Sequence, residues 1–331
     1  MKKKKVSNNE SYVSSLRPLK LENFIGQKIL KEKLRMYIYA AKKRNETLDH
    51  VLFYGPPGLG KTSLAMVITN EMGTKIHIVS GPSIEKIGDI ASILNDLAPG
   101  DILFIDEIHR LPRVVEESLY TAMEDFKFSI IINREINPQT VTIDLPPFTL
   151  IGATTKIGMI SNPLRARFGI TEKFDFYDID DLAEIVENSS KFFNVKIDKE
   201  AAIEIAKRSR GTPRNSNTYL KRIRDFVNFQ NISIISKDAA IEGFKLLKID
   251  SIGLNSFDMA YLSCIKNRFN GGPVGIENIA NFIGDEVENI EEVIEPYLIK
   301  IGFIERTIKG RKLTSNCLKY LKQISFIKEC S

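Results

Sequence analysis

The string GPPGLGKT, from Gly55 to Thr62, constrains the fold more than any other part of this 331-residue chain. It matches the pattern GxxxxGK followed by Ser or Thr, and it lies between an apolar run at 51–54 and a helix-like stretch at 62–71. In this context the glycines let backbone N–H groups surround phosphates at the positive end of a helix. We therefore predict a phosphate-binding loop in which Lys61 reaches the β and γ phosphates and the Thr62 hydroxyl binds Mg²⁺. An ordinary glycine-rich turn is the less favoured interpretation.

Apolar strands alternate with helical stretches between about residues 17 and 177. The runs at 51–54, 75–79, 102–105 and 148–151 are rich in β-branched and aromatic residues, and patterned helices such as 62–71 and 114–123 lie between them. Strands that are buried on both faces and separated by helices indicate a parallel sheet in an α/β fold. With 43% hydrophobic residues, the chain can build the buried core that such a fold needs.

Two further parts follow. Helix-like stretches at 182–192, 201–209, 217–229 and 239–247 predict a small all-helical domain, with Asp180-Asp181 capping the first helix and Asp198 the second. Stretches at 256–269, 275–283 and 289–301, then two strands joined by a tight turn at Lys309-Gly310 and a helix at 314–324, predict a winged helix. The predicted domains are a polar, lysine-rich arm at 1–15, the α/β domain at 16–179, the helical domain at 180–250 and the winged helix at 251–331.

Polar side chains end two of the predicted strands. Asp106 and Glu107 follow the apolar run at 102–105, so we expect Asp106 to hold Mg²⁺ and Glu107 to orient the attacking water. Thr155, at the end of the next strand, is a candidate to sense the γ-phosphate or hold that water. The plain alternatives are a solvated acidic loop and a structural threonine.

Three arginines are candidates for contact with a transferred phosphate. Arg165 and Arg167 follow the last predicted strand, and an arginine there can stabilise transition-state charge in a neighbouring subunit. A surface ion pair is the alternative. Arg214 stands at the start of a helix of the helical domain, where it can fold over the nucleotide and report its γ-phosphate. Its alternative is simple helix-start chemistry, because Pro213 is ordinary in a first turn.

Composition excludes several classes of protein. No apolar run approaches the roughly 18–20 residues of a membrane span, and no apolar segment follows the basic start as a signal peptide would require. Three cysteines without a CxxC pair and three scattered histidines argue against a disulfide framework or a zinc site. We therefore expect a cytoplasmic protein. The formal charge of +5 only mildly suggests an anionic partner.

The order of these motifs resembles that of the AAA+ ATPases and, more closely, the RuvB family, the bacterial motor of Holliday-junction branch migration. The specific strings are DEIHRL from Asp106 and LPPFTLIGATT from Leu145, followed by PLRARFG and GTPR. The resemblance runs from about residue 17 to 320, nearly the whole chain. It implies an ATP hydrolase acting on DNA, with ATP and Mg²⁺ as cofactors, that works in recombination and repair as a homo-oligomeric ring, a hexamer.

The resemblance also implies roles for individual residues. Around the adenine it places Leu16, Arg17 and Tyr177, and on the phosphates Gly58, Gly60, Lys61, Thr62 and Ser63. It adds Glu124, Asp125 and Phe126 to the nucleotide site. Arg167 becomes the arginine finger given to the adjacent subunit, with Arg165 as second choice, and Arg214 becomes the sensor on the lid domain.

The implied partners are double-stranded DNA, RuvA and, within the same junction complex, RuvC. RuvA would bind the hairpin at 128–143, although its turn from Asn133 to Gln139 departs from the Gly-Pro-rich, basic family pattern. The third domain carries seven acids and no base from Glu277 to Glu295, but eight bases against two acids from Pro296 onward. We therefore expect the wing to hold the DNA backbone, with Arg306 and Arg311 projecting from its tip, and little base readout.

Two alternatives stay open at this point. A clamp-loader-like AAA+ ATPase would share the nucleotide motifs but lack the C-terminal winged helix. A DNA-binding regulator that uses ATP as a switch would need a base-reading helix, and the acidic third helix of the last domain argues against one.

Overall fold

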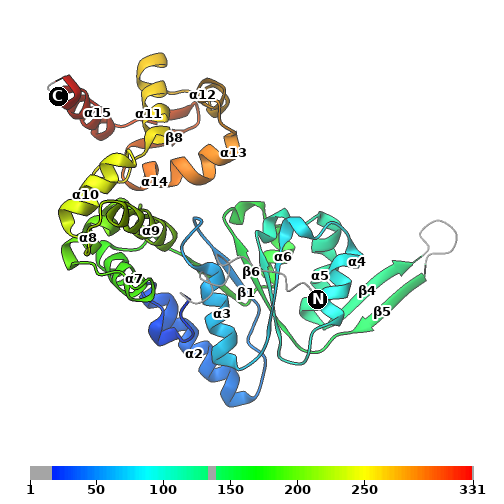
Figure 1. The fold of residues 1–331 in the computed structure, drawn as a ribbon. Coiled ribbons are helices and arrows are strands. Elements are labelled where there is room, and N and C mark those ends of the chain that lie inside the picture. The colour runs from blue at the N-terminus through cyan, green and yellow to red at the C-terminus, as the bar shows by residue number, and fades with distance from the viewer. Residues whose placement is uncertain (1–16, 133–138, 330–331) are drawn as a thin grey trace, which may run out of the picture. The chain divides into compact units, whose positions relative to one another are not determined.

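The computed structural model describes residues 17–132 and 139–329 (Figure 1). The chain divides into two compact units, Met1–Tyr177 and Asp178–Ser331. This division falls two residues before the predicted boundary at 179/180. Within the described ranges, no helix is long and apolar enough to cross a membrane. The predicted arm at 1–15, Leu16 and most of the predicted hairpin turn lie outside the described residues.

The first unit is built on a five-stranded parallel sheet in the order β2-β3-β6-β1-β7. Its central strands are almost wholly buried, which is why their sequences are nearly continuous apolar runs. The prediction of a parallel α/β sheet is confirmed. The strands are β1 (Val51–Tyr54), β2 (Ile76–Ser80), β3 (Ile102–Asp106), β6 (Thr149–Thr154) and β7 (Ile170–Lys173).

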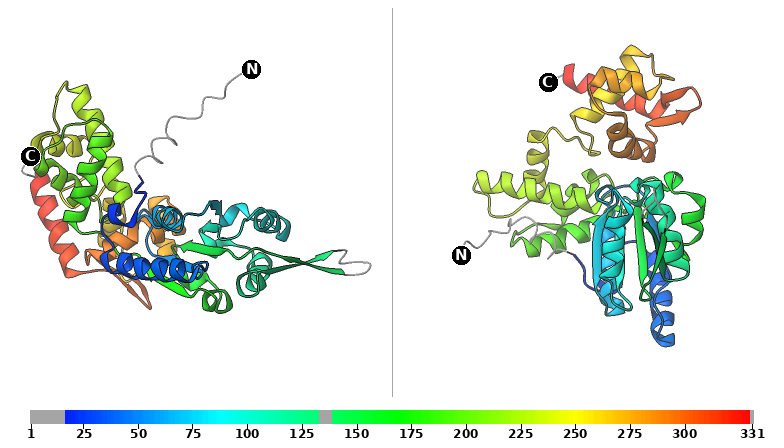
Figure 2. Two further views of the ribbon diagram at one scale, coloured as in Figure 1. Left: turned by 90° about the horizontal axis from the view of Figure 1, so that it is seen from below. Right: turned by 90° about the vertical axis from the view of Figure 1, so that its right-hand side faces the viewer.

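Helices connect and cover these strands (Figures 1 and 2). Buried side chains such as Ile90 and Leu119 join two of the helices to Leu103 and Leu150 of the sheet in one core. The helices are α2 (Lys28–Arg44), α3 (Lys61–Met72), α4 (Ile87–Asn95), α5 (Arg113–Glu124) and α6 (Asn162–Ala166). The sequence pattern does not single out α2, α4 or α6 as helices, nor the edge strand β7.

A two-stranded hairpin extends from the first unit. In the chain it lies between α5 and β6. Strands β4 (Lys127–Ile132) and β5 (Gln139–Asp144) pair antiparallel, with Lys127 opposite Asp144. Figure 2 shows the ribbon reaching away from the sheet. Phe128 is buried at its base, where the Leu145 N–H donates to the Phe126 carbonyl at 2.7 Å. The hairpin is therefore anchored in the core at one end.

The second unit begins with four helices, α7 (Ile179–Phe192), α8 (Lys199–Arg208), α9 (Pro213–Phe229) and α10 (Lys237–Leu246). Asp198 caps α8 by accepting a hydrogen bond from the Ala201 N–H, as predicted. The capping prediction for Asp180-Asp181 is wrong, because α7 begins at Ile179 after the N-cap Asp178. The two acids lie in the first turn, where they still favour the positive helix end.

The rest of the second unit is a winged helix. Tyr261 and Leu298 are fully buried in its core. Gly310 starts the second wing strand with φ of +125°, and a Cβ there would overlap the Val274 carbonyl, so only glycine fits. The elements are α11 (Ser256–Arg268), α12 (Ile276–Ile283), α13 (Val287–Asn289), a π-helical segment (Ile290–Ile294), α14 (Glu295–Lys300), β8 (Ile304–Thr307), β9 (Gly310–Leu313) and α15 (Ser315–Glu329).

One carboxylate of the acidic run is buried where the π-helical segment meets α14. Pro296 has no N–H for the carbonyl four residues earlier, so a regular α-helix cannot continue through it. Glu295, just before it, is completely buried and accepts a hydrogen bond from the Tyr261 hydroxyl at 2.9 Å. Burial and this carboxylate raise the pKa of Tyr261, which therefore stays a neutral donor.

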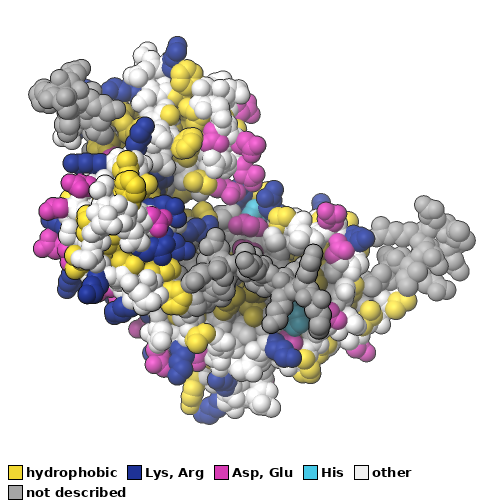
Figure 3. Space-filling view, in the orientation of Figure 1, with side chains coloured by type: hydrophobic (Ala, Val, Ile, Leu, Met, Phe, Trp, Pro, Cys, Tyr) yellow, Lys and Arg dark blue, Asp and Glu magenta, His cyan; other side chains and the backbone are white. Residues whose placement is uncertain are grey.

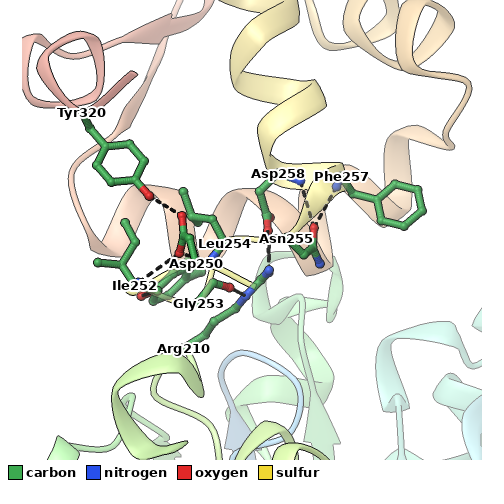
Figure 4. Close-up of polar contacts among 10 residues, drawn as sticks. Arg210, Asp250, Ile252, Gly253, Leu254, Asn255, Phe257, Asp258 and Tyr320 are labelled. Carbon is green, nitrogen blue, oxygen red and sulfur yellow. Dashed lines mark hydrogen bonds and ion pairs between the residues drawn. The ribbon is translucent and has the colours of Figure 1, made fainter. Parts of the chain in front are cut away.

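A buried ion pair joins the helical part of the second unit to the winged helix (Figure 4). Arg210 donates from both terminal nitrogens to the Asp258 carboxylate and from Nε to the Gly253 carbonyl at 2.8 Å. Asp258 also accepts from the Asn255 N–H at 2.8 Å, in the capping box of α11. Tyr320 donates to Asp250 in the same connection. Both residues of the ion pair are buried, so this joint is part of the core of the unit.

Candidate nucleotide and DNA sites

The phosphate loop joins β1 to α3 as the sequence predicts. Gly58 and Gly60 have φ of +80° and +99°, which glycine adopts without strain. Lys61 is the first residue of α3 and is buried, and its Nζ donates to the Gly55 and Pro56 carbonyls at 2.7 and 3.0 Å. The ammonium group is thus held across its own loop, beside the N-terminus of the helix. This geometry fits the phosphates of a nucleotide.

Aromatic side chains flank the loop. The Tyr177 hydroxyl donates to the Leu59 carbonyl at 3.2 Å, and a Cβ on Gly60 would lie 3.3 Å from the Phe24 ring. Phe24 was missed by the sequence analysis, because nothing in its local pattern links it to a loop some 35 residues later. Arg17 is half-buried, and its Nη1 lies 2.9 Å from the Met66 sulfur of α3. These contacts bring Arg17 and Tyr177 to the same loop-and-helix region.

The polar strand ends meet at one edge of the sheet. Strands β3 and β6 are neighbours, and the Thr155 hydroxyl donates to Glu107 Oε2 at 3.2 Å. Asp106 Oδ1 accepts from the Glu107 N–H at 3.1 Å. His109 is buried with its Nδ1 2.9 Å from the Thr154 hydroxyl, which agrees with a local hydrogen-bonding role. Strand β6 lies between β3 and β1. Asp106 and Glu107, at the end of β3, are therefore separated from the strand of the phosphate loop by one intervening strand.

A glycine maintains the backbone of Glu107, whose φ is +49°. A Cβ on Gly81, just after β2, would overlap the Glu107 carbonyl oxygen. Only glycine allows this close approach. The segment after β2 therefore packs directly against the backbone that follows β3.

Arg167 ends the short helix α6, and its guanidinium lies against α5. Its Nη2 donates to Glu124 at 3.0 Å, and its Cζ lies 4.4 Å from the centre of the Tyr120 ring. Arg165, the second choice for a finger, is exposed. Asp125 is exposed as well, and Phe126 is half-buried with its ring edge-on to Phe148. The structure therefore brings Arg167 and Glu124 together in one subunit.

Arg214 is exposed in the first turn of α9, where Pro213 is the first residue. The Thr212 hydroxyl caps this helix by accepting a hydrogen bond from the Asn215 N–H at 3.4 Å. Arg210, four residues before Arg214, is the arginine buried in the joint with Asp258. The sequence analysis had not singled out that pair.

The guanidiniums of the wing arginines, Arg306 and Arg311, are oriented differently from the prediction. The two residues face each other across β8 and β9, but their guanidiniums turn back to the buried Glu295 instead of projecting from the tip. Arg311 also contacts Glu291 at 2.8 Å and is only 15% exposed, whereas the Arg306 side chain is 46% exposed. The prediction that both extend freely is wrong, because a carboxylate buried without them would remain uncompensated. Lys309 is exposed at the turn.

Acidic side chains remain on the surface beside the wing. Figure 3 shows a group of them over α13, where Glu286 and Glu288 are exposed. They give this helix a negative surface, as the sequence predicts. Two other acids of the run, Glu291 and Glu295, are neutralised by the wing arginines. The contrast between an acidic helix and a basic wing is therefore weaker than the sequence count suggests.

Comparisons with known proteins cover all three parts of the chain. Three family models match in order: the Holliday junction DNA helicase RuvB P-loop domain at residues 16–174, the RuvB AAA lid domain at 177–250, and the RuvB C-terminal winged helix domain at 251–322. These matches support the RuvB interpretation over the clamp-loader-like and regulator alternatives.

Whole relatives agree with the family models. The chain is 53% identical over 307 residues to the Holliday junction branch migration complex subunit RuvB of Pediococcus pentosaceus, covering 93% of this chain and 91% of the relative. It is 51% identical over 308 residues to the RuvB subunit of Streptococcus uberis, covering 93% and 92%. A solved structure of Thermotoga maritima RuvB, described as a Holliday junction branch migration motor, matches with a TM-score of 0.85 and 47% identity, covering 93% and 98%. The chain belongs to the RuvB family of AAA+ proteins.

Proposed function

We propose that this chain is an ATP-driven motor that moves double-stranded DNA during Holliday-junction branch migration, in homologous recombination and repair. The observation that carries the proposal is the joint presence of a phosphate loop, an acidic strand end and a winged helix in a chain that is 53% identical to a named branch migration subunit. The protein would hydrolyse ATP in the first unit and hold DNA with the second.

Nucleotide binding would use the loop and its aromatic border. Leu16, Arg17 and Tyr177 would surround the adenine, and Gly58, Gly60, Lys61, Thr62 and Ser63 would bind the phosphates. The helix end of α3 and the Lys61 ammonium supply the positive charge that such an anion needs. Thr62 and Asp106 would hold Mg²⁺, which supplies charge neutralisation between the β and γ phosphates when it is bound.

Hydrolysis would depend on the edge formed by β3 and β6. Glu107 would orient and polarise the attacking water, and its hydrogen bond from Thr155 fixes the carboxylate for that task. Thr155 would sense the γ-phosphate through the same hydroxyl. Lys61 would stabilise charge on the transferred group.

A neighbouring subunit would complete each site. Arg167 would act as the arginine finger, and Glu124, Asp125 and Phe126, at the end of α5, would belong to the same face. An arginine given in trans requires a neighbouring subunit, and we propose that the subunits form a hexameric ring. Arg214 at the start of α9 would report the nucleotide state to the lid domain. Arg165 is exposed beside this face and remains the second choice for the finger.

DNA would be held by its backbone. Arg306 and Lys309 are exposed on the wing and suit phosphate contact, and Arg311 would act mainly by supporting Arg306 through their common partner Glu295. The hairpin β4–β5 would bind RuvA, and RuvC would join the same junction complex in the cytoplasm.

The direct test is dissociation of a synthetic four-way junction by the purified chain, with and without RuvA, in ATP and Mg²⁺. We expect ATP-dependent separation into two duplexes that RuvA stimulates. Matched controls replace ATP with a nonhydrolysable analogue and the chain with Glu107→Gln. ATP hydrolysis without any junction dissociation, even with RuvA, would contradict the proposed function while leaving the nucleotide site intact.

A further inference from the structure

We propose that Tyr120 is the positioning residue for Arg167, and that its ring is the platform on which the guanidinium is oriented toward a neighbouring subunit. The inference rests on the proposed role of Arg167 as the arginine finger. It adds the residue that gives this finger a defined direction before any neighbour or nucleotide is present.

The contacts of Arg167 divide into two kinds. The first are local: its Cζ lies 4.4 Å from the centre of the Tyr120 ring, and Nη1 donates to the Pro163 carbonyl at 2.8 Å. The second is the ion pair between Nη2 and Glu124, whose side chain is 54% exposed. An ion pair with an exposed partner contributes little and is easily exchanged. A phosphate can therefore replace Glu124 while the ring and the Pro163 carbonyl keep the guanidinium in place.

The side chain of Arg167 is well enclosed for a residue at the end of a helix. It is only 21% exposed, and its Nε is buried with no hydrogen-bond partner in the part of the chain that the structure describes. Stacking on the ring therefore replaces a hydrogen bond as the contact that restrains this part of the guanidinium. Cation–π contacts of this kind gain strength where water is excluded.

Tyr120 is itself held firmly on α5. Its hydroxyl donates to Glu116 Oε1 at 3.0 Å and lies 3.0 Å from the Ser161 hydroxyl. Ser161 also donates to Glu116, and it caps α6 by accepting from the Leu164 N–H at 3.3 Å. Arg167 stands at the other end of this helix. One tyrosine thus contacts the finger through its ring and the start of the finger's helix through its hydroxyl.

This arrangement matters for turnover because an unrestrained arginine has many rotamers to lose when it meets the transferred phosphate. A finger that is already oriented loses fewer of them. A misplacement of about 1 Å can reduce a rate by about 100-fold without any change in substrate binding. Loss of the Tyr120 platform should therefore lower kcat.

The test compares Tyr120→Leu, which removes the ring, with Tyr120→Phe, which keeps it and removes the hydroxyl. In the assembled full-length protein we expect Tyr120→Leu to lower kcat about 10- to 100-fold at unchanged affinity for a fluorescent ADP analogue. Tyr120→Phe should keep most of the turnover, because the stack survives. Equal losses in both variants would overturn the inference, since a packing role for the hydroxyl would then explain them.

A double-mutant cycle separates this inference from the function on which it rests. In an Arg167→Ala background, Tyr120→Leu should cause no further loss of kcat, because the platform then has nothing to orient. A further loss of about tenfold would overturn the inference and leave the finger assignment intact. If Arg167→Ala itself kept the parental rate, the finger assignment would fail first.

Mixed rings give an independent readout. Tyr120→Leu subunits mixed with Glu107→Gln subunits should recover part of the turnover, because some interfaces then pair an intact Tyr120–Arg167 with an intact Glu107. A merely misfolded Tyr120→Leu subunit would not be rescued in this way. Absence of rescue in rings shown to be mixed would therefore count against the platform.

Discussion

Glu107 and His50 show how single side chains depend on their immediate neighbours. Glu107 has φ of +49°, a conformation that costs a non-glycine residue on the order of 1–3 kcal/mol, and its carboxylate accepts from Thr155. His50 is buried, with Nδ1 accepting from the Leu150 N–H at 2.9 Å and Nε2 3.0 Å from the Met123 carbonyl. Because Nδ1 accepts, the ring is neutral and Nε2 is the donor. In both cases the neighbouring hydrogen-bonding groups determine how the side chain is oriented or where it carries its proton.

The substitution Glu107→Gln should leave nucleotide binding intact and abolish turnover, because an amide keeps the shape of the side chain but cannot polarise water. The matched variant Lys61→Ala should weaken binding itself, because it removes the loop's cation. Affinity for a fluorescent nucleotide and steady-state ATP hydrolysis measure the two effects separately. Parental hydrolysis by Glu107→Gln would show that the role assigned to Glu107 is wrong.

His50 predicts a loss of stability on mild acidification. Burial lowers its pKa below the ordinary value of 6.5, so the folded protein favours the neutral ring. Its contribution is complete above about pH 6.5 and is lost as the pH falls toward the folded pKa, because protonation removes the acceptor for Leu150. The urea concentration at the unfolding midpoint should therefore decrease as the pH is lowered from about 7.5 to about 5.5. His50→Asn, which cannot titrate, should show a smaller decrease in the midpoint. An equal change of the urea midpoint with pH in His50→Asn and in the unsubstituted protein would refute this prediction.

At the scale of elements, the wing shows how one buried carboxylate fixes a hairpin to a helix. Glu295, which directly follows the π-helical segment, is buried and binds both Arg306 and Arg311. The two strands of the wing are thus fixed to the helix that precedes them. Exposed positive charge remains at Lys309 and, in part, at Arg306.

The wing residues should therefore differ in their effect on DNA binding. Lys309→Ala and Arg306→Ala should each reduce the salt slope of duplex binding by about 0.9, equally for unrelated sequences, because each removes one phosphate contact. Arg311→Ala should mainly lower the melting temperature, because it removes one of the two arginines that pair with the buried Glu295. Binding isotherms at several salt concentrations on two unrelated duplexes measure the slopes. A loss confined to one sequence would indicate base readout and contradict backbone binding.

At the scale of the whole molecule, each compact unit combines parts that differ in role. The first carries the nucleotide site and the hairpin, and the second carries the lid helices and the winged helix. In the second unit, Arg210 of the lid pairs with Asp258 of the winged helix. Arg210 lies four residues before the proposed sensor Arg214. The segment that carries the proposed sensor is therefore joined to the winged helix by a buried contact.

Asp258→Asn should destabilise the second unit by about 3–5 kcal/mol, because it leaves the buried Arg210 without its counter-charge. Asp225→Asn is the matched control. Asp225 pairs with Arg222 and Arg224 but is 43% exposed, so its loss should cost at most about 1 kcal/mol. Thermal or urea unfolding of the full chain measures both. Similar small losses in the two variants would show that the joint does not depend on this ion pair.

Local patterns were sufficient to predict much of this architecture. The phosphate loop, the four strands around it and the helices of the second unit depend on periodicity, glycines and caps that lie close together in the sequence. The polar strand ends at Asp106, Glu107 and Thr155 were also predictable, because parallel strands align their ends at one edge. The sequence alone thus determined the fold class and the identity of the nucleotide-site candidates.

Tertiary structure decided which partners these side chains meet. The same wing sequence that predicts two free arginines folds so that both bind Glu295, and a buried carboxylate requires such partners. Phe24 beside Gly60, Tyr120 beneath Arg167 and Asp258 with Arg210 are likewise contacts between distant segments. No local pattern specifies them, because burial and charge pairing arise only when elements far apart in the chain pack together.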